Sequence, residues 1–233
     1  MPGPNTPSSA RLLNLAVHEL RTPASIVGGY LRMLLAGHAG PLTDKQHKML
    51  TEAVRATDRL TALVAEMSEI SNLDAGTLAL PRQRVVIVPL LQEAAAGLGE
   101  TSDGGARVEV RLAEGIDAGA VVLADSVRLR AAVVAVLTAL AREQADAAPL
   151  VLAAGIEQAG DPPAIVVRIG EREALADPAG PPAPFDEWRG GVGLALPIAR
   201  RVIEAAGGRI WSAPARASRP VVGIALPLAT PDA

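Results

Sequence analysis

The sequence has no cysteine and very few aromatic residues: two tryptophans, one tyrosine and one phenylalanine among 233 residues. The lack of cysteine excludes a disulfide framework, a thiolate metal site and a cysteine nucleophile. The scarcity of aromatic rings argues against stacking platforms for bases or sugars. Basic blocks are also missing, and 22 Lys and Arg face 25 Asp and Glu. Nucleic acid is therefore not the expected partner.

Long hydrophobic runs are absent as well. The strongest apolar stretch, residues 131–141, is short and ends at Arg142, so no membrane-spanning helix is predicted. The opening MPGPNTPSS lacks the charged and apolar regions of a signal peptide. We expect a soluble, cytoplasmic protein without direct membrane insertion. Residues 1–10 are predicted to form a disordered tail, and the length allows one large domain or two small ones.

Two segments have apolar residues at alternating steps of four and three, the spacing of a heptad repeat. The first stripe comprises Leu13, Val17, Leu20, Ala24, Val27, Leu31 and Leu34. The second comprises Met49, Ala53, Ala56, Leu60, Leu63, Met67 and Ile70. Each stripe predicts a long helix, the second capped by Thr43 and ended by Gly76. Because only a short Gly- and Pro-containing segment at 37–41 joins them, the two helices must be antiparallel.

A lone hairpin cannot bury both stripes. Residues 11–76 are therefore predicted to form an all-α helical hairpin that pairs with a second copy of the chain in a dimeric four-helix bundle. A homodimer is the expected state.

A turn at Ala75-Gly76 and Pro81 begins a second domain, residues 82–229, in which short β-rich runs alternate with helical ones. We expect an α+β sandwich of sheet and helices. The predicted strands are 107–112, 120–123, 150–154, 164–169, 209–211 and 221–226, and the predicted helices are 88–98, 126–144 and 194–206. The proline-rich segment Asp177–Pro184 is expected to be a loop or lid.

The first helix carries a candidate nucleophile, His18. It follows the stripe residue Val17 by one position, about 100° around the helix, and is therefore expected to be open to water. Glu19 adjoins it, and Thr22 lies one turn along the same face. An imidazole beside a carboxylate can act as a nucleophile, and Pro23 is expected to bend the helix. The alternative is an ordinary surface histidine, which is how we interpret His38 and His47.

The string HELRTP at residues 18–23 resembles the phospho-acceptor box of sensor histidine kinases. The end of the second helix, LVAEMSEISNLDAG, resembles the matching helix of their dimerisation and histidine-phosphotransfer domain. The resemblance implies that His18 is the phospho-acceptor and Glu19 the acid/base helper. It implies that Thr22 positions the water that dephosphorylates a bound response regulator. A response-regulator receiver domain is therefore the expected partner.

The second domain resembles the histidine-kinase ATP-binding domain of the gyrase, heat-shock-ninety and MutL type. The run GGVGLALPI at 190–198 is similar to its second glycine box, and Phe185 and Trp188 are similar to the aromatic box before it. By this resemblance Gly191, Gly193 and Leu194 are the phosphate-binding positions. Arg142 stands at the family's phosphate-binding lysine, and Glu171 at its adenine-binding aspartate.

Other parts of this ATP-binding pattern are degenerate. The two asparagine positions hold Ala135 and Ala139. In the family the second asparagine is a magnesium ligand, and alanine offers no oxygen, so no metal site is predicted. In the first glycine box, Glu173 and Leu175 replace both glycines, and their side chains block a close backbone approach to nucleotide. The expected result is no cofactor, with ATP and magnesium bound only if the pocket still functions.

Three functions remain open. The favoured one is a phosphotransfer protein, or a phosphatase through Thr22, in which His18 exchanges a phosphoryl group with a response-regulator aspartate. The second is an active ATP-dependent kinase with an atypical pocket, which the lost asparagines and glycines disfavour. The third is a non-enzymatic dimeric scaffold that docks regulators, which the intact HELRTP string disfavours because docking alone needs neither the imidazole nor its carboxylate.

Overall fold

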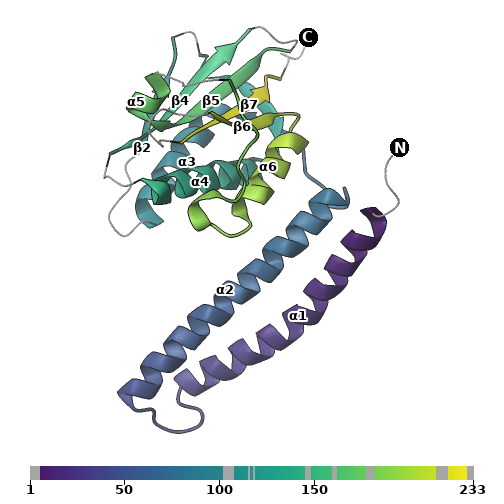
Figure 1. Cartoon of the computed structure of the whole chain (residues 1–233), viewed down its shortest axis with the longest axis vertical. Coiled ribbons are helices and arrows are strands. Elements are labelled where there is room, and N and C mark those ends of the chain that lie inside the picture. The colour runs from purple at the N-terminus through teal and green to yellow at the C-terminus, as the bar shows by residue number, and fades with distance from the viewer. Residues whose placement is uncertain are drawn as a thin grey trace. The chain divides into compact units, whose positions relative to one another are not determined.

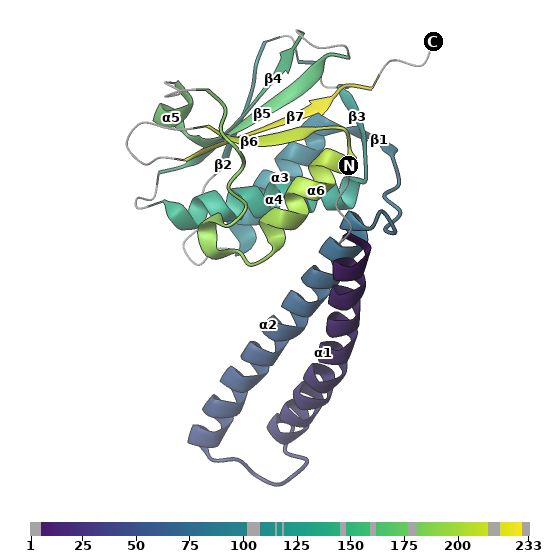
Figure 2. The ribbon, with the colours of Figure 1, turned by 45° about the vertical axis from the view of Figure 1, so that its right-hand side comes forward.

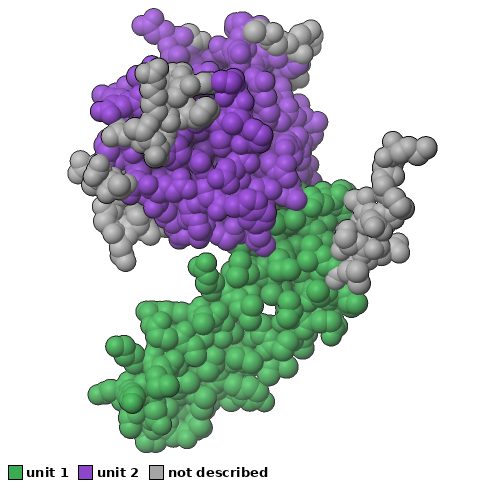
Figure 3. All heavy atoms as spheres, in the orientation of Figure 1, with its two compact units in different colours: residues 1–78 green, residues 79–233 purple. Residues whose placement is uncertain are grey.

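The computed structural model describes residues 6–101, 108–114, 116–117, 119–144, 148–158, 162–176, 181–213 and 220–229. The chain divides into two compact units, Met1–Leu78 and Ala79–Ala233, which Figure 3 colours separately. Within the described residues, no helix combines the length and the apolar character that a membrane crossing requires.

Unit 1 is a hairpin of two long helices, α1 (Thr6–Leu35) and α2 (Asp44–Asp74), which lie side by side (Figure 1). The predicted cap is confirmed: the Thr43 side chain accepts a hydrogen bond from the backbone N–H of Gln46, whose own side chain accepts from the Thr43 N–H. Gly37 and Gly40 in the connection adopt positive φ, 78° and 107°, a conformation that L side chains disfavour. The hairpin is therefore specified locally, by a glycine turn and a capping box.

The start of α1 differs from the expectation of a tail over residues 1–10. The helix begins at Thr6, so residues 6–10 are helical, whereas residues 1–5 lie outside the described part of the chain. Residues 7–10, PSSA, hold one proline near the helix start, where its missing N–H costs nothing. Helix α1 continues on both sides of Pro23.

Packing in the hairpin uses only part of the two apolar stripes. Val17 and Ala24 of α1 and Val64 of α2 are buried, whereas Leu20 and Val27 remain 45 % and 50 % exposed. On α2, the predicted stripe members Met49, Ala56 and Leu60 are exposed. A single hairpin therefore leaves a large share of its apolar surface uncovered.

Unit 2 is built on a five-stranded sheet in the order β2-β4-β5-β7-β6. Only the β2–β4 pair is parallel. The strands are β2 (Val108–Leu112), β4 (Leu150–Glu157), β5 (Ala164–Glu171), β6 (Arg209–Ala213) and β7 (Val221–Pro227). A separate two-stranded sheet pairs β1 (Gln83–Val86) with β3 (Val121–Ala124). The six predicted strands are present, β1 is an addition to them, and Arg107 lies outside the described residues.

Three helices cover one face of this sheet: α3 (Ile87–Thr101), α4 (Ser126–Glu143) and α6 (Ala195–Ala205) (Figures 1 and 2). Between them and the sheet lies the core, in which Leu137, Ile165, Ile169, Ile203 and Ile224 are almost fully buried. The predicted α+β sandwich is confirmed. Two short elements were not predicted, α5 (Arg172–Ala176) and the 3₁₀ turn η1 (Arg189–Gly191). Of the expected loop at 177–184, residues 177–180 lie outside the described residues, and Ala183 pairs with Ser212 of β6.

Helix α4 begins at a charged cap, Asp125, and this cap provides a test of the fold. Its carboxylate accepts hydrogen bonds from the Arg128 backbone N–H at 3.0 Å and from the Arg128 guanidinium at 2.8 Å. Burial raises the pKa of Asp125, but these contacts lower it by more, so the pKa is below its usual value. We expect Asp125→Ala to reduce the free energy of unfolding by about 1 kcal/mol at neutral pH.

The same cap predicts a pH dependence. Because the pKa is lower in the folded state, the stabilisation is complete above the unfolded-state pKa of about 3.9 and is lost as the pH falls through the folded-state value. Urea unfolding at neutral pH and near pH 3 measures the free energy of unfolding of wild type, of Asp125→Ala and of the exposed control Glu114→Ala. If both variants matched wild type at neutral pH, the cap would not stabilise α4.

Candidate functional site

His18 is displayed on the surface of α1. Its side chain is 76 % exposed, and its Nδ1 lies 3.7 Å from a carboxylate oxygen of Glu19. Because Nδ1 faces this carboxylate, Nε2 is the ring nitrogen available to an incoming group. The neighbouring Val17 is 3 % exposed, so the backbone that carries His18 is anchored by packing while the ring remains open to solvent. This exposed ring and neighbouring carboxylate match the requirements of a histidine nucleophile.

Thr22 is exposed and lies one helical turn beyond His18 on the same face of α1. Pro23 follows it and has no N–H, so the carbonyl of Glu19 receives no helical hydrogen bond there. The other two histidines, His38 in the connection and His47 on α2, are exposed.

The glycine-rich turn of unit 2 packs directly on α4. Gly190, Gly191 and Gly193 all have positive φ, between 57° and 70°. A Cβ atom at Gly190 would lie 2.6–2.7 Å from the Cα, Cβ and carbonyl oxygen of Ala139, which is itself 1 % exposed. The turn therefore occupies the space beside position 139 and fits only because both residues are small.

Hydrogen bonds from the end of α4 fasten this turn. The Glu143 carboxylate accepts from the backbone N–H of Gly190 at 2.9 Å, and the Arg142 guanidinium donates to the carbonyl of Gly191 at 3.0 Å. The N–H of Gly190 is a donor of the kind that a phosphate uses at a glycine-rich turn, and here a carboxylate of the chain itself accepts from it. The Arg142 cation is likewise engaged with the turn.

Arg189 adds ion pairs to the contact between the glycine turn and the end of α4. Its Nε lies 3.9 Å from carboxylate oxygens of both Glu143 and Asp186, and Nε and Nη1 are buried without a hydrogen-bond partner among the described residues. A buried guanidinium is costly without compensating negative charge. The two carboxylates supply this charge, so the cation and the turn are held together against α4.

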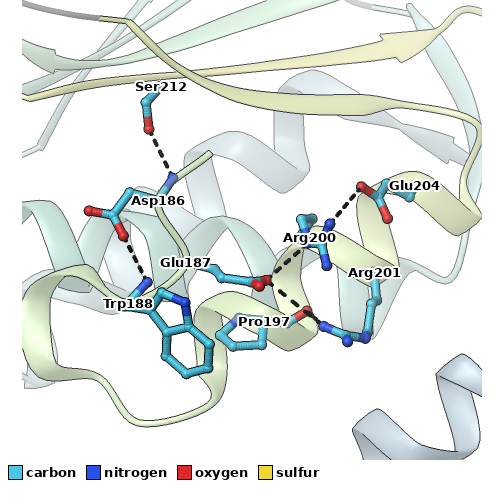
Figure 4. A network of polar contacts seen from close by, with 8 residues as sticks. All are labelled: Asp186, Glu187, Trp188, Pro197, Arg200, Arg201, Glu204 and Ser212. Atoms are coloured by element: carbon cyan, nitrogen blue, oxygen red, sulfur yellow. Dashed lines mark hydrogen bonds and ion pairs between the residues drawn. The ribbon is translucent and has the colours of Figure 1, made fainter. Parts of the chain in front are cut away.

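The segment before the turn is joined to α6 by a polar network (Figure 4). The Glu187 carboxylate accepts a hydrogen bond from Nε of Arg200 at 3.0 Å and lies 3.9 Å from Nη1 of Arg201. The Asp186 carboxylate accepts from the backbone N–H of Trp188, and the Asp186 N–H donates to the Ser212 hydroxyl. Residues 186–188 are therefore tied both to α6 and to β6.

The segment in place of the first glycine box takes a different course. Glu171 is half-buried at the end of β5 and pairs in register with Leu150. Glu173 and Leu175 follow at once in α5. Leu175 lines a groove with Arg168 and Trp211, on the sheet face opposite α4. Leu175 therefore lines the face of the sheet that α4 does not cover.

Comparison with known proteins identifies the domain that carries His18. Residues 8–76 match the His Kinase A (phospho-acceptor) domain, a range that contains His18, Glu19 and Thr22. The sensor protein KdpD of Mycobacterium tuberculosis is 27 % identical over 209 residues, which cover 85 % of this chain. Residues 8–76 therefore carry the phospho-acceptor domain of histidine kinases, and the chain as a whole is similar to sensor histidine kinases.

Further comparisons give one distant relative and two solved structures with a similar fold. The non-motile and phage-resistance protein of Caulobacter vibrioides is 26 % identical over 91 residues, 39 % of this chain and 11 % of that protein. The crystal structure of full-length ShkA in complex with AMPPNP is similar in fold over 96 % of this chain and 47 % of that one, with a TM-score of 0.72 and 23 % identity. The Acinetobacter baumannii histidine kinase AdeS has a TM-score of 0.57, with 19 % identity, over 91 % of this chain and 98 % of that one. The chain spans 24 % of the length of KdpD.

Compared with the nucleotide site that the resemblance implies, the described residues around the glycine turn differ at position 139 and at the Gly190 N–H. Position 139 offers no oxygen ligand and is covered by Gly190, and the Gly190 N–H already has a carboxylate acceptor. Magnesium needs oxygen ligands in near-octahedral geometry.

Sequence reasoning missed two residues that hold the glycine turn, Glu143 and Arg189. Glu143 follows Arg142 directly and ends α4, and Arg189 directly precedes Gly190. Because they adjoin Arg142 and the glycine turn, which the sequence analysis had already singled out, their charges could have been considered there. Their contact with one another depends on the fold.

Ala139→Asn tests the contact between the turn and α4. Restoring an asparagine beside Gly190 forces the turn away or strains the core, with an expected loss of about 1–3 kcal/mol in the free energy of unfolding. Ala131→Asn, at an exposed position of the same helix, is the matched control and is expected to cost less than about 1 kcal/mol. Thermal and urea unfolding measure both variants. Equal stabilities for the two would show that Gly190 does not fill the space beside position 139.

Proposed function

We propose that this protein is a phosphotransfer member of the histidine kinase family that exchanges a phosphoryl group between His18 and a response-regulator aspartate. The observation that carries the proposal is the contrast between the two units. His18 and Glu19 are open and adjacent, whereas the glycine turn is occupied by Glu143, Arg142 and Ala139.

The transfer step follows from the ring's orientation. Nε2 attacks the phosphorus of the aspartyl phosphate, an N–P bond forms, and the P–O bond to the aspartate breaks, which releases a carboxylate. The imidazole then loses its Nδ1 proton. Glu19, 3.7 Å from Nδ1, is placed to accept this proton after a small side-chain rotation. The reverse sequence returns the phosphoryl group to the regulator.

Thr22 is proposed to act in dephosphorylation. Its hydroxyl lies one turn from His18 on the exposed side of α1, where it can hold a water against a phosphorylated aspartate docked on this face. A hydroxyl both donates and accepts hydrogen bonds, so it can orient a water without being consumed.

The working form is proposed to be a homodimer. Leu20, Val27, Met49 and Leu60 are each at least 45 % exposed on one hairpin, and they follow the heptad stripes. A second hairpin that covers these residues completes a four-helix bundle. Soluble monomers rarely expose apolar surface of this extent.

Binding of ATP distinguishes the proposed phosphotransfer protein from an ATP-dependent autokinase. We expect millimolar ATP with magnesium to raise the melting temperature by less than about 1 °C, because a ligand far below its Kd stabilises almost nothing. Differential scanning fluorimetry measures the shift. ADP with magnesium and magnesium alone serve as controls. A shift of several degrees that requires the nucleotide would favour the autokinase instead.

The transfer itself is tested with labelled regulators. Receiver domains from the same genome are phosphorylated with labelled acetyl phosphate, separated from the donor and mixed with the protein. Label that moves to the protein and is stable in base but labile in acid identifies phosphohistidine. Label that remains on every receiver, or leaves only as inorganic phosphate without a protein-bound stage, would contradict the proposed exchange.

A further inference from the structure

A groove lies on the face of the five-stranded sheet opposite α3, α4 and α6. Its cavity volume is about 370 Å³. Arg168 of β5, Gly223 of β7 and Trp211 of β6 lie in one row across neighbouring strands. Strand side chains alternate between faces. Since Ile169 is buried in the helix-covered core, the neighbouring Arg168 projects to the other side, into this groove.

One wall of the groove is the indole ring of Trp211, which packs against Gly223 of the neighbouring strand. A Cβ atom at Gly223 would lie 2.2 Å from the indole ring, so only glycine admits the ring at this position. The Arg209 guanidinium lies 5.1 Å from the centre of the ring, and its Nη2 is 3.5 Å from a carboxylate oxygen of Glu157. The ring and the Arg209 cation are therefore held in place before any ligand arrives.

Arg168 is the unsatisfied group of the groove. The residue is exposed, and its side chain has no hydrogen-bond or ion-pair partner among the described residues. Its cross-strand neighbours, Ala153 and Gly223, are too small to cover it. Among the described residues that line the groove, two cations, Arg168 and Arg209, face one carboxylate, that of Glu157, so the described lining has a net positive charge.

The remaining lining is largely apolar. Leu175, Ala174 and Val221 contribute to the walls, and Ala174 and Val221 are themselves 5 % and 4 % exposed. A free guanidinium fork recognises a planar carboxylate through two parallel hydrogen bonds. Ligand pockets generally combine apolar walls with a few such polar anchors, and this volume is near the lower end of their range of about 300–1,000 Å³.

We propose that this groove binds a small organic carboxylate with a compact apolar body, anchored by Arg168. The site is separate from the glycine turn, because the sheet lies between the groove and α4. It therefore does not depend on whether His18 transfers phosphoryl groups. It gives unit 2 a small-molecule site of its own.

Benzoate is the probe, and the fluorescence of Trp211 is the readout. Trp188→Phe removes the other tryptophan, whose side chain is 72 % exposed, and leaves Trp211 as the single reporter. We expect a saturable change in its fluorescence in the millimolar range of benzoate. Benzamide, which has the same ring without the charge, and acetate, which has the charge without the ring, are expected to bind far more weakly.

Two charge variants with opposite expected effects identify the anchor. Arg168→Met weakens benzoate binding by about tenfold or more, because a hydrogen bond to a charged group is lost. Glu157→Gln strengthens it, because a neighbouring negative charge is removed. Arg130→Met, an exposed arginine on α4, leaves binding unchanged, and circular dichroism verifies that each variant is folded. Equal affinity for benzoate and benzamide, no saturable change, or an unaltered Kd in Arg168→Met would overturn the proposal.

Discussion

Replacing His18 by glutamine is expected to reduce the acid-labile phosphoryl label on the protein to background. Glutamine keeps a polar side chain of similar reach on an exposed helical position, but its amide nitrogen is not a nucleophile. Since the His18 side chain is 76 % exposed, the free energy of unfolding is expected to change by less than about 0.5 kcal/mol. The measurement is the amount of label bound after mixing with phosphorylated receiver domain.

Three further variants act as controls for this result. His38→Gln and His47→Gln alter the other exposed histidines and are expected to accept label as wild type does. Thr22→Ala is expected to accept label normally but to release inorganic phosphate from the regulator more slowly. Label on His18→Gln at the wild-type level would remove His18 from the mechanism.

A charged substitution in the exposed stripe of α1 is expected to convert the dimer into a monomer. In the double variant Leu20→Glu, Val27→Glu, each new carboxylate would be enclosed by the second hairpin. Placing an unpaired charge in an apolar contact costs several kcal/mol. The dimer would bury four such charges, two from each protomer. Their summed cost exceeds the net free energy that stabilises a four-helix interface.

Light scattering and sedimentation at micromolar concentration measure this change. Ser25→Glu introduces the same carboxylate at an exposed polar position of α1, and it is expected to remain dimeric. Wild-type protein that is monomeric at this concentration, or a double variant that stays dimeric, would contradict the bundle.

The helices of unit 1 were predictable because their signals are local. The heptad spacing of apolar residues indicated both helices, and Thr43 with Gln46 specified the start of α2. The apolar spacing did not indicate how much of each stripe one hairpin buries. Val17 and Leu20 belong to the same stripe, yet one is 3 % and the other 45 % exposed, because a single partner helix contacts only one side of the stripe.

The core strands of unit 2 were also predictable, since β5 and β7 are rich in β-branched and other apolar residues, with Arg168 as the exposed exception in the middle of β5. Strand β1 was missed because it is short and half of its signal, Gln83 and Arg84, is exposed and polar. Helix α5 was missed because five residues are too few to show helical periodicity.

The candidate nucleotide site was predictable in composition but not in arrangement. The alanine at position 139, where the family resemblance expects an asparagine, predicted that the magnesium ligand is absent. The packing of Gly190 on that alanine and its hydrogen bond to Glu143 join residues 47 to 51 positions apart. Contacts of this kind follow from how α4 and α6 pack together, and no local pattern encodes them.

The most direct test offers the phosphoryl group from two sources in parallel. One sample receives γ-labelled ATP with magnesium, and the other receives the labelled receiver domain, at equal specific radioactivity. If His18 transfers the phosphoryl group and the glycine turn does not bind ATP, the wild-type protein acquires base-stable, acid-labile label from the receiver domain but not from ATP. The His18→Gln variant acquires no label from either source. Label from ATP that appears in wild type and disappears in His18→Gln would contradict the account, because it would make the protein an ATP-dependent kinase.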